Sequence, residues 1–175
     1  MKKAVAPIFL LLVCAVVAFA VQDSAWINYN SAEGRYSVAL PSQPEIGTQE
    51  AATADGVKFT QYKAMVIKGK TVFLVGYFDH VPGTTFSLDK AGEGLVNGVK
   101  GTLLSQSPIS LGANPGREMK VATKAEDGAE YLLHARFYDV DQRIYVLQFL
   151  ILKTDNDSAA AANAAKYFDS FKVLK

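Results

Sequence analysis

The residues of this sequence best suited to chemistry are Asp79 and His80, which directly follow an apolar run at Thr71–Phe78. A carboxylate beside an imidazole is the combination from which proteins build general bases and parts of metal sites. Adjacent residues on an extended strand point to opposite faces, so we do not expect these two side chains to touch each other. A hydrolase or metal-dependent enzyme centred on this pair is therefore the last of the three hypotheses for function that are given at the end of this section.

The sequence carries no other signature of catalysis. The second histidine, His134, lies in a segment of alternating residues that a solvated or helix-covered sheet face explains. The only cysteine, Cys14, lies in the N-terminal apolar run. With two separated histidines, a structural zinc site is nearly excluded. The sequence contains neither a G-x-S-x-G elbow nor a glycine-rich nucleotide loop. We therefore predict a protein without cofactor, metal or catalytic residues.

An aromatic group near the N-terminus is the candidate binding site. Trp26, Tyr29 and Tyr36 lie close together in the sequence, with Arg35 beside them. Large aromatic side chains usually pack, so the group could close one end of a sheet. Alternatively, it could form an exposed patch for a partner or an apolar ligand. Three further arginines could supply polar contacts to such a patch: Arg117, Arg136 and Arg143.

The first twenty residues have the features of a secretory signal peptide. Lys2 and Lys3 precede an unbroken apolar run, and Ala18-Phe19-Ala20 has the small-x-small pattern of a cleavage site. We predict cleavage after Ala20, which would release residues 21–175 as one periplasmic or secreted domain without a stable membrane span. Cys14 is followed by apolar residues, unlike a typical lipid-attachment cysteine, and would leave with the leader.

The charge balance restricts the class of partner. The whole chain has 18 Lys+Arg and 17 Asp+Glu. Removal of Lys2 and Lys3 leaves 16 against 17, a net charge near −1. A chain so close to neutral, without a basic run, lacks the electrostatic footprint of proteins that bind nucleic acid or anionic lipid surfaces. We expect no nucleic-acid partner.

The elements that position these residues are mainly strands. Alternating or apolar runs separated by turn residues predict strands at 26–30, 36–40, 45–53, 57–67, 71–78, 103–111, 117–124, 129–140 and 144–152. The short turns favour antiparallel pairing, with a hairpin at 26–40 and a meander over the later strands. Thr71–Phe78 and Ile144–Leu152 are apolar on both faces, so the sheet needs a covering layer on each side.

Two helices are predicted to provide those layers. The first is marked by apolar residues at helical spacing: Leu88, Ala91, Leu95, Val99 and Leu103. The second covers Ser158–Ser170, where Asp157 or Ser158 can cap the first turn. The expected fold class is therefore α+β, an α/β/α sandwich in which helices flank an antiparallel sheet.

Three segments together resemble a known family, and they span essentially the whole chain after residue 20. They are Trp26-x-x-Tyr29-x-Ser31-x-Glu33-Gly34-x-Tyr36-Ser37-Val38-x-Leu40-Pro41-x-x-Pro44, Arg143-Ile144-Tyr145-Val146-Leu147-Gln148-Phe149, and Tyr167-Phe168-Asp169-Ser170-Phe171-Lys172-Val173-Leu174. The chain resembles the Mog1/PsbP-like fold family, especially its small exported bacterial members. The resemblance implies an antiparallel sheet flanked by helices and a non-enzymatic role through binding surfaces. Its motifs consist of packing and turn residues, so they indicate fold rather than activity.

Three functions follow as hypotheses, in this order. The first is an exported, non-catalytic binding or accessory protein of the cell envelope, whose partner is an envelope protein or a small ligand. The second is a carrier of a small apolar ligand in a cavity between sheet and helices. The third is the enzyme centred on Asp79 and His80.

Overall fold

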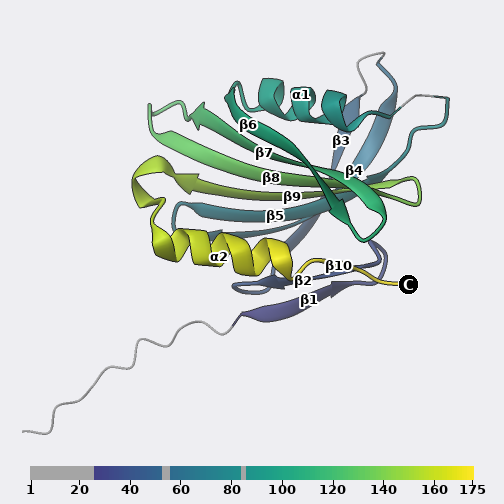
Figure 1. Ribbon diagram of the computed structural model, residues 1–175, viewed down its shortest axis with the longest axis horizontal. Coiled ribbons are helices and arrows are strands. Elements are labelled where there is room, and N and C mark those ends of the chain that lie inside the picture. The colour runs from purple at the N-terminus through teal and green to yellow at the C-terminus, as the bar shows by residue number, and fades with distance from the viewer. Residues whose placement is uncertain (1–25, 53–55, 84–85) are drawn as a thin grey trace, which may run out of the picture.

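A seven-stranded antiparallel sheet forms the centre of the computed structural model, which describes residues 26–52, 56–83 and 86–175 (Figure 1). The strand order is β3-β4-β5-β9-β8-β7-β6. The strands are β3 (Glu45–Ala52), β4 (Lys58–Lys68), β5 (Thr71–Asp79), β6 (Thr102–Leu111), β7 (Asn114–Lys124), β8 (Glu130–Val140) and β9 (Arg143–Leu152). The predicted meander is confirmed, because β6 to β9 pair in sequence order.

A second, smaller sheet lies against one face of the large one. It contains β1 (Ile27–Ser31), β2 (Tyr36–Leu40) and β10 (Lys172–Val173), in the order β1-β2-β10. The hairpin predicted at 26–40 is therefore confirmed, but it pairs with the C-terminal strand and not with the large sheet. Helix α2 (Ser158–Asp169) lies on the same face, and α1 (Leu88–Gly98) lies on the opposite face (Figure 1). This arrangement confirms the α+β sandwich.

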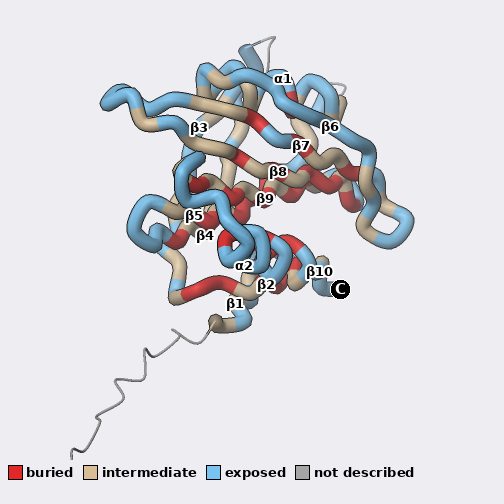
Figure 2. Tube along the Cα trace, turned by 60° about the vertical axis from the view of Figure 1, so that its left-hand side comes forward, coloured by how far each residue is buried: buried red, intermediate tan, exposed pale blue. Residues whose placement is uncertain are grey.

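The central strands β5 and β9 are covered on the α2 face, but on the α1 face only part of each strand is covered. The prediction that a helix covers both of their faces is therefore only partly confirmed, because Val72, Leu74 and Leu150 stay partly exposed on the α1 face. On β5, Phe73 and Val75 belong to the larger core, which also contains Tyr167 of α2. Phe78 points to the other face and packs with Ile144 beneath α1. Figure 2 shows the buried residues concentrated in the central strands and in the layer facing α2.

Helix α1 is shorter than predicted. It ends at Gly98, and Leu103, the last residue of the predicted apolar stripe, lies in β6 with 40% of its surface exposed. The prediction that the helix reaches Leu103 is wrong. Lys100 has a left-handed backbone (φ 49°), which ends the helix. At Gly101 the chain passes so close to β7 that a Cβ atom would lie 2.5 Å from Cγ1 of Val121.

Side-chain caps fix where both helices begin. In α1, the Ser87 hydroxyl accepts a hydrogen bond from the backbone N–H of Lys90. In α2, the Asp157 carboxylate accepts one from the N–H of Ala160 at 2.9 Å. The predicted cap at Asp157 is confirmed, and it fixes the start of the helix that carries Tyr167 into the core.

The predicted signal peptide, with its cleavage site after Ala20, lies outside the described residues. Within the part of the chain that the structure describes, no helix is both long and apolar enough to cross a membrane.

Candidate functional site

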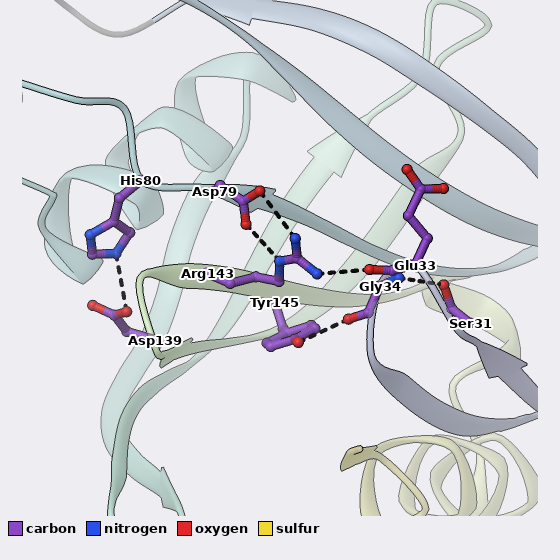
Figure 3. Close-up of polar contacts among 8 residues, drawn as sticks. All are labelled: Ser31, Glu33, Gly34, Asp79, His80, Asp139, Arg143 and Tyr145. Atoms are coloured by element: carbon purple, nitrogen blue, oxygen red, sulfur yellow. Dashed lines mark hydrogen bonds and ion pairs between the residues drawn. The ribbon is translucent and has the colours of Figure 1, made fainter. Parts of the chain in front are cut away.

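Asp79 and His80 lie at the end of β5 and point to opposite faces of the sheet, as expected from their adjacency (Figure 3). The Asp79 carboxylate accepts two hydrogen bonds from Arg143, at 2.6 Å from Nε and 3.1 Å from Nη2. Arg143 also donates from Nη1 to the carbonyl of Glu33 at 2.9 Å, and its guanidinium lies 4.4 Å from the ring centre of Tyr77. Arg143 therefore ties the large sheet to the turn between β1 and β2, and Asp79 holds its guanidinium in place.

His80 has a different set of contacts. Its Nε2 lies 3.1 Å from Oδ1 of Asp139, and its ring stacks on Phe86 with 5.1 Å between ring centres. These contacts hold the segment before α1 against the sheet. Among the described residues, no three histidine, aspartate, glutamate or cysteine side chains gather closely enough to hold a metal ion. The two residues of the sequence motif thus have separate partners, Arg143 for Asp79 and Asp139 for His80.

The Asp79 ion pair predicts an acid-dependent stability. The hydrogen bond from Arg143 is the main cause that lowers the pKa of the Asp79 carboxyl below its usual value. Since the folded state favours the ionised form, this contribution is complete above the unfolded pKa, near 4, and disappears as the pH falls through the folded pKa. We expect Asp79→Asn to reduce the loss of stability below about pH 4, measured by urea unfolding at several pH values.

The matched control is Asp141→Asn, because Asp141 is exposed and forms no ion pair with another described residue. It should leave the acid dependence unchanged. The interpretation would be wrong if both variants lost stability below pH 4 as steeply as the wild type.

The aromatic residues at the N-terminus pack mostly against the core. Tyr36 is only 2% exposed, and its ring lies 6.1 Å from that of half-buried Tyr29. Trp26 is half-buried with its ring edge-on to Phe73, and the Lys166 ammonium lies 4.7 Å from the centre of the Trp26 ring. The binding of a partner at this aromatic group stays a prediction. Within the group, the half-buried rings of Trp26 and Tyr29 are the ones that a partner could contact.

The arginines that were expected to add polar contacts to this aromatic group form ion pairs at other places in the structure. Arg117 pairs with Asp89 of α1, and Arg136 donates to Glu118 and Asp169. Arg35 is exposed and adopts a left-handed backbone at φ 52°, without an ion pair to another described residue.

An apolar groove of about 470 Å³ lies on the α1 face of the large sheet, away from all of these residues. Its apolar lining includes Ile67, Val72, Leu74, Val99, Leu133 and Leu150. Val72 pairs across the strands with Leu150, and Leu150 pairs with Leu133, so these three side chains form a row across β5, β9 and β8. Val72, Leu74 and Leu150 are only partly buried.

The position and length of α1 explain why this surface is open. The helix contacts β7 and β8, whereas Phe59 and Phe86 pack over Phe78 at the far end of β5. An 11-residue helix is about 16 Å long, while the 9-residue β5 extends about 30 Å. After α1 ends, Val99 forms a wall of the groove, and its carbonyl accepts a hydrogen bond from the Thr123 hydroxyl at 2.6 Å.

The sequence pattern does not predict the groove. Val72, Leu74 and Leu150 belong to strands that are apolar on both faces, and that pattern predicts a helix over each face. The open surface depends on where α1 ends and which strands it covers. The only sequence signal was the glycine content around residues 98–101.

No protein-family model matches the chain, and no curated protein matches it. The solution structure of cyanobacterial PsbP (CyanoP) from Synechocystis sp. PCC 6803 is similar to it, with a TM-score of 0.57 and 10% sequence identity over 92% of this chain and 97% of that chain. The fold is PsbP-like. A crystal structure of a protein of unknown function from Pseudomonas aeruginosa also matches, with a TM-score of 0.46 and 14% identity over 81% of this chain and 94% of that chain.

The three segments that carry the resemblance to the PsbP-like fold meet in space. The Tyr145 hydroxyl donates to the carbonyl of Gly34 at 2.9 Å, which joins the second segment to the first (Figure 3). Phe171 of the third segment packs against Tyr36 and Tyr145, with 5.8 and 5.4 Å between ring centres. These motifs hold the small sheet and α2 on the large sheet. They account for the PsbP-like fold and leave the groove on the opposite face unexplained.

Proposed function

We propose that this chain is an exported, non-catalytic binding protein of the cell envelope, and that the apolar groove is the surface through which it binds. The observation that carries the proposal is the lining of the groove. A row of valine and leucine side chains crosses β5, β9 and β8 on the α1 face, and its members Val72 and Leu150 are partly exposed. Burying that surface against an apolar ligand is favourable, by about 25 cal/mol per Å².

The size and chemistry of the groove fit a small ligand. Its volume of about 470 Å³ lies within the range of about 300–1,000 Å³ found for small-molecule sites. Within the described part of the chain, no aspartate, glutamate, histidine or cysteine lines it, so these residues offer none of the side chains that most often act as general bases. The arrangement favours binding over reaction, and it corresponds to the ligand-carrier hypothesis.

Export is supported by the leader sequence. Lys2 and Lys3 followed by the apolar run and Ala18-Phe19-Ala20 have the pattern of a secretory signal peptide. A binding protein released after Ala20 would meet envelope components directly. The near-neutral charge of the remaining chain agrees with a partner other than nucleic acid.

Native mass spectrometry of the protein purified from its own host tests this function. We expect a small molecule to co-purify with the wild type and to be lost from Leu74→Trp, because the larger side chain fills the groove. Leu104→Trp is the matched control, since Leu104 is exposed on β6 outside the groove. Circular dichroism would establish that both variants fold. The absence of any bound mass in the wild type would contradict the proposal.

A further inference from the structure

We infer that the ligand of the groove is a single-chain amphiphile with an anionic head, namely an alkyl carboxylate. This inference rests on the proposed function and specifies its ligand class. It arises from a division of the groove into two chemically different parts, an apolar floor and a cationic rim. Of the described residues that line it, only Lys70 and Lys124 are charged.

Both lysines are available to a ligand. Each is exposed, and neither forms an ion pair with a carboxylate among the described residues. The acidic residue opposite Lys124 in the strand register is Glu130, which pairs with Lys153 at 3.0 Å; its pKa is lowered first by Lys153 and, to a smaller extent, by the charge of Lys124. Among the described residues that line the groove there is no aspartate or glutamate, and the nearby Glu130, which lies outside the groove, is shared between Lys153 and Lys124. An anionic group placed between the two lysines would provide a counter-charge within the groove.

The two lysines lie at the same end of the large sheet. Lys70 is in the turn between β4 and β5, and Lys124 ends β7. β5 and β7 are separated by β9 and β8, so the two positions are about 14 Å apart across the sheet. The row of Val72, Leu150 and Leu133 crosses the sheet between them. A ligand head at this end is therefore flanked by a lysine on each side.

The tail of the ligand has a path along the floor. Leu74 lies two residues further along β5 than Val72 and points to the same face, further from the lysine end. An alkyl chain that starts between the lysines can run from Val72 toward Leu74. Burial of the tail supplies most of the affinity, while the lysines select the charge of the head.

The test compares decanoate with decan-1-ol, which have the same tail length and differ in the charge of the head. Isothermal titration of the wild-type protein should show that decanoate binds about fivefold more tightly, because exposed ion pairs contribute modestly. The double variant Lys70→Gln/Lys124→Gln should lose this preference and keep its affinity for decan-1-ol. The matched control, Lys90→Gln/Lys172→Gln, removes two exposed lysines outside the groove and should behave as the wild type.

The outcomes separate this inference from the proposed function. Equal affinity of the wild type for both ligands, or tighter binding of decan-1-ol, would overturn the anionic ligand while leaving an apolar binding groove. A decanoate preference that survives the Lys70/Lys124 double substitution would also overturn it. Binding of neither ligand would contradict the proposed function itself.

Discussion

Phe171→Ala is expected to lower the free energy of unfolding by about 3–5 kcal/mol. Phe171 is 3% exposed, and its ring packs against three others. It stacks parallel on Tyr138 at 5.8 Å and lies 5.8 Å from Tyr36 and 5.4 Å from Tyr145. Truncation would leave a cavity at the point where α2 and the small sheet meet the large sheet, since these rigid neighbours cannot close around it.

Urea unfolding followed by circular dichroism measures this effect. Leu174→Ala is the control, because Leu174 comes from the same C-terminal segment but is 37% exposed. It should change the stability by less than about 1 kcal/mol. A loss below about 1 kcal/mol for Phe171→Ala would show that the C-terminal segment does not secure the sandwich.

Gly34→Ala is expected to destabilise the protein by roughly 3 kcal/mol, at the upper end of the range for overpacking. A Cβ atom at Gly34 would lie 2.5 Å from Cε1 of Tyr36 and 2.7 Å from Oγ of Ser31. The Tyr36 ring cannot move aside, because it is buried and packed against Tyr145 and Phe171. The substitution must therefore shift the turn between β1 and β2 and disturb the hydrogen bond from Tyr145 to the Gly34 carbonyl.

Gly94→Ala is the matched control, with an effect of opposite sign. Gly94 lies inside α1, and an added Cβ atom would meet nothing within 4 Å. Alanine favours the helix over glycine by about 1 kcal/mol, so this variant should be slightly more stable than the wild type. If Gly34→Ala and Gly94→Ala unfolded at the same urea concentration, the close approach at Gly34 would be refuted.

Much of the fold could be predicted because its signals are local. The turn residues between β6, β7, β8 and β9 predict their antiparallel meander, and Asp157 marks the start of α2. Residues that are apolar on both faces of β5 and β9 indicated a sheet covered on two sides. The separation of β1 and β2 into their own sheet could not be predicted, because it depends on pairing with β10, a strand of two residues at the other end of the chain.

The candidate sites were harder to predict from sequence. The divergence of Asp79 and His80 follows from strand geometry, but their partners Arg143 and Asp139 come from distant segments of the chain. The groove depends on an absence of cover, which local patterns do not encode. An apolar strand face that packs beneath a helix has the same composition as one that binds a ligand.

The most direct test of the groove as the binding surface is a methyl NMR titration of the protein with decan-1-ol, whose uncharged head makes the result independent of the lysines. The account predicts that methyl signals of Val72, Leu74 and Leu150 shift with added ligand, while those of Val38 and Val173 in the small sheet stay in place. Shifts confined to the small sheet, or no shifts at all, would contradict it.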